Sequence, residues 1–320
     1  MKYNRRKFLG YSALVGATAS GAWLGFSQGR AARWLRRIIA DSRRGVQPAP
    51  VKPEPGKWSD NTVSICWIGH ATILINFYGI RILTDPTLGD RCGVDIGIGT
   101  AGPKRYIAPA LRLKELPPID LVLLSHAHMD HLDLASLSPF IGKTPIVAAK
   151  NTSDLISDGK SKPPTELKWG ENFTLQTDRG ELQIEAFQVN HWGQRWPSEK
   201  IGRGYNGYIL RREGRSVLFG GDTANTSLFG EVRSRRPFDV AVMPIGAYQP
   251  WIRYHCTPEQ AVEMANAARV DYIVPIHHQT FKLSDEPMNE PIERIQSALQ
   301  REPERLALKR IGETFFLPKA

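Results

Sequence analysis

Three histidines and two aspartates crowd into one short stretch of this chain. The stretch "LLSHAHMDHLD", residues 123–133, places His126, His128, Asp130 and His131 directly after an apolar run. Imidazole and carboxylate groups are the ligands that borderline divalent metals prefer. A site for one ion does not need this many ligands. The stretch therefore predicts a centre for two divalent metal ions, with Zn²⁺ as the first choice and iron or manganese as alternatives.

The segments that must position these side chains read as strands. "LVLLS", residues 121–125, is continuously apolar, which is typical of a strand buried on both faces, so the polar residues after it fall at the sheet edge. Paired strand-like arms around a charged, glycine-containing turn predict hairpins over 174–189 and 207–220. Further strands are expected over residues 64–68, 72–77, 81–85, 145–149, 239–247 and 271–278.

Two helices are expected between and after these strands. In "TPEQAVEMANAARV", Thr257 can cap, Pro258 suits the first helical position and Gln260 completes a capping box, which predicts about three turns. The apolar spacing within residues 289–302 predicts a second helix. Strands interspersed with helices favour an α/β sandwich over a pure β-fold.

The charge of the chain is concentrated near its N-terminus. The 320 residues are 41% hydrophobic and carry a formal net charge of +10, but residues 1–57 hold twelve Lys/Arg and only two Asp/Glu. The remaining chain is neutral by this count, which argues against a nucleic-acid partner. The three cysteines lack C-x-x-C spacing, which argues against a thiolate zinc site. Cys66 and Cys92 are expected to be free thiols, with a disulfide as the alternative.

The N-terminal segment is interpreted as a targeting signal rather than as part of the fold. Arg5-Arg6 and the apolar run of residues 8–26 resemble a twin-arginine export signal over 1–28, either cleaved near residues 17–19 or kept as an anchor. Residues 29–57 combine a basic amphipathic segment, suited to an anionic membrane surface, with a proline-rich linker. These features predict export to the periplasm or the outer face of the cytoplasmic membrane, with the catalytic body over 58–320.

The motif H-x-H-x-D-H resembles the signature of the metallo-β-lactamase superfamily. The resemblance implies an αββα sandwich of two mixed sheets flanked by helices. The blocks "CWIGHATILINFYGIRILTDP", "GPKRY", "HAHMDHLD", "GGDT", "GAYQPWIRYHCTPEQAV" and "IHHQTF" resemble, over roughly residues 60–317, the family of phospholipases D that hydrolyse N-acyl-phosphatidylethanolamine. Thr257 and Gln279 depart from that family's pattern, which bears on head-group and acyl-chain preference.

The resemblance also implies a set of site residues. The first ion would be held by His126, His128 and His191, the second by Asp130, His131 and His277, and both by a bridging Asp222. His278 competes with His277 for the last position. The candidate catalytic residues are Asp130 and His255, the latter for phosphate contact or proton transfer to the leaving group, with a structural hydrogen bond as the alternative. His70 would support the ligands from behind, and Tyr248 and Trp251 would line an acyl channel.

The function that the resemblance implies is hydrolysis of a phosphodiester. A hydroxide bridging the two metals would attack the phosphorus of N-acyl-phosphatidylethanolamine or a related glycerophospholipid. The phospholipid and, through the N-terminal segment, a membrane surface are the expected partners, and the oligomeric state is open. The alternatives are a lactonase or other ester hydrolase of the same fold, and a metal-binding protein without catalysis.

Overall fold

The computed structural model describes residues 41, 43–95, 97, 99–157, 159–196, 199–232 and 237–319. The chain divides into two compact units, Met1–Gly45 and Val46–Ala320, and the second holds nearly all the described residues. The export signal over 1–28 and the basic segment up to residue 40 lie outside the described residues. Those two interpretations stay predictions.

The first sheet of the Val46–Ala320 unit has seven strands in the order β15-β1-β2-β3-β6-β7-β8. Strands β15, β1, β2 and β3 pair antiparallel, whereas β3, β6, β7 and β8 pair parallel. The strands are β1 (Val63–Gly69), β2 (Thr72–Phe77), β3 (Ile80–Thr84), β6 (Leu121–Leu124), β7 (Ile146–Ala149), β8 (Thr165–Leu167) and β15 (Thr314–Phe316).

The second sheet has six strands in the order β14-β13-β12-β11-β10-β9 and is also mixed. The hairpins β9-β10 and β11-β12 are antiparallel, and β12, β13 and β14 are parallel. The strands are β9 (Asn172–Thr177), β10 (Gly180–Gln188), β11 (Asn206–Arg212), β12 (Arg215–Phe219), β13 (Phe238–Pro244) and β14 (Val270–Ile276). A separate two-stranded ribbon joins β4 (Val94–Asp95) and β5 (Thr100–Ala101).

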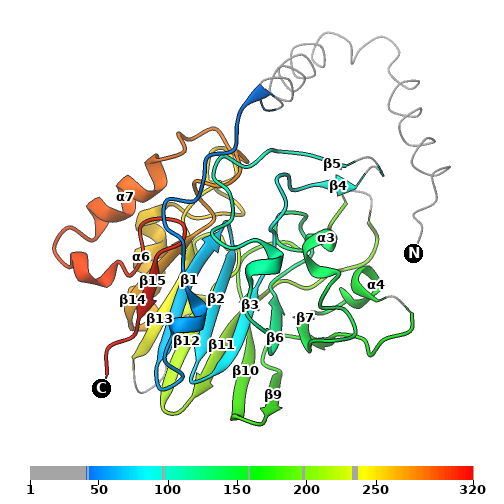
Figure 1. Ribbon diagram of the computed structural model, residues 1–320. Helices are drawn as coiled ribbons and strands as arrows, with labels where there is room; N and C mark the ends of the chain where they lie inside the picture. The colour runs from blue at the N-terminus through cyan, green and yellow to red at the C-terminus, as the bar shows by residue number, and fades with distance from the viewer. Residues whose placement is uncertain are drawn as a thin grey trace, which may run out of the picture. The chain divides into compact units, whose positions relative to one another are not determined.

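Three apolar layers hold these elements together. Side chains of a strand alternate between its faces, so Ile73 and Ile75 of β2 pack with Val240 and Val242 of β13 between the sheets. The opposite face of the first sheet packs against the short helices α3 (Leu134–Leu137) and α4 (Ser153–Ile156). The outer face of the second sheet packs against α6 (Pro258–Ala268) and α7 (Glu290–Ala298), as Figure 1 shows. The predicted αββα sandwich of two mixed sheets is confirmed.

The helix before β14 begins as its sequence predicts. The Thr257 hydroxyl accepts a hydrogen bond from the backbone N–H of Gln260 at 3.3 Å, and the Gln260 side chain accepts from the Thr257 N–H at 3.0 Å. This reciprocal capping satisfies two donors that the first turn of a helix leaves free. The expected helix over 289–302 is also present as α7. The one-turn helix α5 (Leu228–Glu231) was not predicted from the sequence.

The proline-rich segment differs from its interpretation as a linker without a core. The compact unit begins at Val46, twelve residues before the predicted boundary at 58. The backbone of Gln47 donates to Tyr106 O and accepts from Ala108 N, and the side chains of Pro53 and Pro55 are buried. An extended segment can dock by backbone hydrogen bonds and a few apolar contacts, which composition alone does not reveal.

The thiols of Cys66, Cys92 and Cys256 are free and buried.

No helix within the described ranges is long and apolar enough to span a bilayer.

Candidate metal centre

The candidate site lies where the strands of both sheets end. Neighbouring strands of a parallel ladder and alternate strands of an antiparallel one end at the same edge, so residues far apart in the chain meet there. His70 follows β1, His191 follows β10, Asp222 follows β12, His255 follows β13 and His277 follows β14. With the turn after β6, these positions bring seven of the eight histidines into one cluster.

Hydrogen bonds fix the turn after β6 that carries the densest part of the cluster. The backbone N–H groups of His131 and Leu132 both donate to His128 O, which closes a tight turn. The guanidinium of Arg195 donates to Ala127 O and Leu132 O at 2.9 and 2.8 Å and so braces the turn from outside. Arg195 lies some 60 residues downstream, and nothing in its sequence surroundings indicated this role.

The first group of candidate ligands consists of three imidazoles. His126 Nε2 lies 2.8 Å from His128 Nδ1, and His191 Nε2 lies 3.2 Å from the same atom. His191 is oriented by its other nitrogen, Nδ1, which donates to Tyr254 O at 2.8 Å. Burial holds the pKa of His126 and His191 well below the ordinary value and lowers that of His128 to about 4. All three rings are therefore neutral near pH 7, as metal coordination requires.

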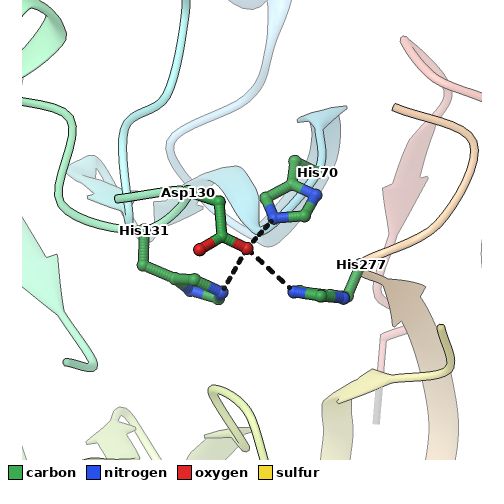
Figure 2. A group of neighbouring side chains, drawn as sticks. All are labelled: His70, Asp130, His131 and His277. Carbon is green, nitrogen blue, oxygen red and sulfur yellow. Dashed lines mark hydrogen bonds and ion pairs between the residues drawn. The ribbon is translucent and has the colours of Figure 1, made fainter. Parts of the chain in front are cut away.

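The second group surrounds two carboxylates. Figure 2 shows Asp130 Oδ2 facing His70, His131 and His277, with Nε2 of His277 at 3.2 Å and Nε2 of His131 at 3.6 Å. Asp222 Oδ2 lies 3.1 Å from His131 Nε2 and 3.2 Å from His277 Nε2. The same oxygen lies 3.9 Å from His191 Nε2, so Asp222 connects the two groups.

In this second group, burial disfavours charged side chains, whereas neighbouring groups of opposite charge favour them. Burial opposes charge on His131 and His277, but Asp222 and Asp130 outweigh it, raising the pKa of His277 to about 9 and that of His131 well above its ordinary value. Burial also opposes charge on both carboxylates, yet the neighbouring imidazoles, His131 foremost, hold their pKa values well below the ordinary range. Both carboxylates are therefore ionised near pH 7 and suit a bound cation.

The spacing and the unmet hydrogen-bonding capacity both fit divalent metal. Ligand atoms bound tetrahedrally at about 2.0–2.1 Å lie roughly 3.3 Å apart, close to the 2.8–3.6 Å separations within the two groups. Buried Asp222 Oδ1 has no hydrogen-bond partner among the described residues. Nitrogen and oxygen donors without sulfur suit zinc, iron or manganese. The residues present therefore fit an ion in each group.

A carboxylate that sequence reasoning missed supports both groups from behind. Asp85, directly after β3, accepts from His131 Nδ1 at 2.7 Å and from the Ser125 hydroxyl at 2.6 Å. That hydroxyl lies 2.9 Å from His126 Nδ1, so one buried carboxylate orients a histidine in each group. The available signal was a carboxylate placed immediately after an apolar strand, as in "RILTD".

His70 lies beside Asp130, in one group with His131 and His277, and its predicted role of supporting the ligands stays a prediction. Its Nε2 is 2.9 Å from Asp130 Oδ2, and burial, followed by the charge of His277, lowers its pKa to about 3. The His70 carbonyl accepts from His277 N at 3.1 Å and from the Trp67 indole at 2.8 Å.

His70, Asp85 and His277 adopt positive φ values of 55°, 34° and 65°, a left-handed conformation that costs of order 1–3 kcal/mol per residue and concentrates at functional sites.

Four other predicted positions fall elsewhere or at the rim. His278 stacks on Trp67 with ring centroids 4.4 Å apart and does not join the groups, whereas His277 does. Tyr248 is buried, and its hydroxyl donates to Glu290 of α7 at 2.8 Å, so it packs locally rather than along a channel at the cluster. Trp251 is 49% exposed. His255 Nδ1 lies 3.8 Å from Asp222 Oδ2 at the edge of the cluster.

Comparison with known proteins is consistent with this geometry. Residues 80–278 match the family model described as the β-lactamase superfamily domain. The chain belongs to this superfamily. Its fold resembles that of a metallo hydrolase from Ignicoccus hospitalis, with a TM-score of 0.60 and 20% identity over 81% of this chain and all of that one.

Two curated relatives share a name. The chain is 33% identical to N-acyl-phosphatidylethanolamine-hydrolyzing phospholipase D 1 of Caenorhabditis elegans, over 70% of this chain and 66% of that protein. It is 28% identical to the mitochondrial enzyme of the same name from Saccharomyces cerevisiae, over 77% of this chain and 54% of that protein. Superfamily membership and the His/Asp cluster together indicate a metal-dependent hydrolase, which the sequence motif predicted. The individual ligand assignments stay predictions.

Proposed function

We propose that this protein is a dinuclear metal-dependent phosphodiesterase of the phospholipase D type, acting on N-acyl-phosphatidylethanolamine or a related glycerophospholipid. The observation that carries the proposal is the pair of ligand groups joined by Asp222. His126, His128 and His191 would hold one ion, while Asp130, His131 and His277 would hold the other. The shared name of the two curated relatives supports the choice of substrate.

Two adjacent ions suit phosphorus chemistry. In-line displacement at phosphorus needs stabilisation of the entering and the leaving oxygen, and a two-metal site provides both. When bound, the ions would supply Lewis acidity and lower the pKa of a coordinated water toward neutrality. Zinc is the first choice for both positions, because the cluster offers imidazole and carboxylate donors only.

The protein's own residues would then orient the substrate and donate a hydrogen bond to it. His128, Asp130 and His255 are the partly exposed members of the cluster, with 16% of the Asp130 side chain and 12% of the His255 side chain accessible, so the phosphate would approach on their side. Burial lowers the pKa of His255 to about 4 although Asp222 opposes this shift. A neutral His255 carries one N–H, which can donate to a phosphoryl oxygen or to the leaving oxygen.

Substrate panels test the proposal against its rivals. The chain, purified without chelator and loaded with zinc, is assayed on N-acylated and plain phosphatidylethanolamine in mixed micelles beside a set of lactones. We expect phosphatidic acid as a product and slow lactone turnover. Efficient lactone hydrolysis with no phospholipid turnover would support the ester hydrolase instead. Bound metal without turnover of either class would support a non-catalytic metal-binding protein.

Export and membrane retention belong to the same proposal, because they would bring the site to its substrate. They rest on the paired arginines and on the basic segment within residues 1–57. A reporter fused after Lys57 should require both arginines for translocation. Export that survives Arg5→Lys with Arg6→Lys would contradict the twin-arginine assignment.

A further inference from the structure

The loop between β13 and α6 exposes three large apolar side chains almost in succession. Trp251, Ile252 and Tyr254 are 49%, 45% and 41% exposed. Arg253 lies among them, exposed and without a hydrogen bond or ion pair to any described residue. The stretch "AYQPWIRYHC", residues 247–256, contains no acidic residue. The loop therefore presents an aromatic and aliphatic surface with a single positive charge.

Hydrogen bonds hold this loop in its exposed conformation. The Trp251 indole N–H donates to Leu283 O at 3.3 Å. The backbone N–H groups of Tyr254 and His255 both donate to Trp251 O, at 2.8 and 3.0 Å. The apolar side chains are thus displayed on a closed turn in which the N–H groups of Tyr254 and His255 are paired. Such a turn can enter a less polar medium without leaving these donors unpaired.

The exposed loop is continuous with the candidate metal centre. The carbonyl of Tyr254 accepts the hydrogen bond from His191 Nδ1, and the next residue in the chain is His255. The Tyr254 ring lies 5.8 Å from Trp192, whose ring lies 4.4 Å from that of His128. An aromatic path therefore leads from the loop surface to a candidate ligand. A molecule bound at the cluster would extend its remaining length beside this loop.

We propose that residues 250–254 form a docking loop that inserts into the surface of a phospholipid bilayer. Tryptophan and tyrosine concentrate at membrane interfaces, where their rings lie among the head groups. Ile252 would enter the boundary of the acyl chains, and the Arg253 guanidinium would contact lipid phosphates. The choice of a phospholipid surface rests on the proposed function. The loop itself is a feature separate from the chemistry.

The size of the surface argues against a second copy of the chain as the occupant. Large aromatic side chains bury about 150–250 Å² each when fully covered. Three side chains that are 41–49% exposed therefore offer roughly 200–340 Å², well below the roughly 800 Å² per partner of a stable protein interface. Shallow insertion into a bilayer has no such minimum, and phosphate groups complement the positive charge of Arg253.

Fluorescence quenching by brominated lipid tests the insertion directly. The full chain is mixed with vesicles of phosphatidylcholine and phosphatidylglycerol, with and without bromine on the acyl chains. The other seven tryptophans contribute equally in wild type and Trp251→Phe, so the difference between the two isolates Trp251. We expect stronger quenching of the wild type. Equal quenching of both proteins would overturn the proposal.

Vesicle partition supplies a second readout with a matched control. Ile252→Ser should weaken partition by on the order of tenfold, because a half-buried aliphatic side chain is lost from the bilayer. Phe316→Ser, at a residue 53% exposed on β15, should leave partition unchanged. Equal losses would mean non-specific adsorption and would contradict the proposal. A second contradicting result would be a dimer that sedimentation detects without lipid and that Ile252→Ser dissociates, while the partition of this variant into vesicles stays that of the wild type.

These binding experiments need no turnover, so their failure and that of the phosphodiesterase proposal are distinguishable. Thermal unfolding of each variant checks that the fold is intact.

Discussion

At the scale of single residues, the buried carboxylate of Asp85 links the two groups of candidate ligands. It contacts His131 directly and reaches His126 through the Ser125 hydroxyl. Partners of this kind fix the tautomer and the orientation of a metal-binding imidazole. Asp85 therefore acts through the histidines and is a positioning residue rather than a catalytic one.

Asp85→Asn should weaken metal binding by about 10–100-fold, because the amide is a poorer acceptor for His131 Nδ1–H. Competition with a chromophoric chelator measures the change. The matched control is Asp239→Asn, which alters a buried carboxylate paired with Arg215 near the start of β13, at the opposite end of the strand from the cluster. Metal affinity that falls equally in both variants would mean that general destabilisation, rather than positioning, is responsible.

His255→Ala should slow substrates with poor leaving groups much more than an activated nitrophenyl phosphodiester, by about 10²–10⁴-fold on the former. An activated leaving group needs no proton, so it is insensitive to the loss of the donor. His278→Ala is the control, because this ring stacks on Trp67 away from the cluster. Equal losses on both substrate types would assign His255 a structural or phosphate-positioning role instead.

At the scale of elements, Glu166 on β8 stabilises the beginning of α4. Its carboxylate accepts hydrogen bonds from the backbone N–H groups of Asn151, Thr152 and Ser153 at 2.7–2.8 Å. Burial opposes its charge, but these bonds and the Ser153 hydroxyl outweigh it and lower the pKa of Glu166 below its ordinary value of 4.5. The charged carboxylate is therefore bound more favourably in the folded protein.

Glu166→Gln should reduce the free energy of unfolding by about 1–3 kcal/mol at pH 7. Because the folded-state pKa is lowered, this stabilisation is fully present above the unfolded pKa near 4.5 and is lost as the pH falls through the folded value. Urea unfolding of the wild type and of Glu166→Gln should show a smaller difference in the free energy of unfolding in mild acid than at pH 7. Glu171→Gln is the control, because this exposed carboxylate contacts only Lys168 among the described residues, through the backbone N–H and the ammonium group. A difference in the free energy of unfolding that does not change with pH would contradict this role of the Glu166 charge.

The elements that the sequence predicts are those with strong local patterns. The run at 121–125, the hairpin turns and the capping box at Thr257 each carry their signal within a few neighbouring residues. Strand β15 and the pairing of β1 with it depend on contacts 250 residues apart, which periodicity does not encode. The bracing by Arg195 and the docking of Pro53 and Pro55 are long-range in the same way.

At the scale of the whole molecule, the site follows from how two sheets share an edge. The hydroxyl of Tyr208 on β11 donates to Leu124 O at the end of β6, which joins the sheets beside the His-rich turn. The motif identified the superfamily and hence this edge, but it did not indicate which side opens to solvent. The partial exposure of Asp130 and His255 beside the apolar loop gives that direction, and it matches a lipid-borne substrate.

The most direct test of the central claim is the fate of water oxygen during turnover. The zinc-loaded chain is incubated with N-acyl-phosphatidylethanolamine in H₂¹⁸O, and the products are analysed by mass spectrometry. Attack on phosphorus predicts one ¹⁸O in the phosphate of phosphatidic acid and none in the released N-acylethanolamine. Label in a fatty-acid carboxylate would show that the enzyme cleaves a carboxylic ester or the N-acyl amide, and it would contradict the phosphodiesterase assignment.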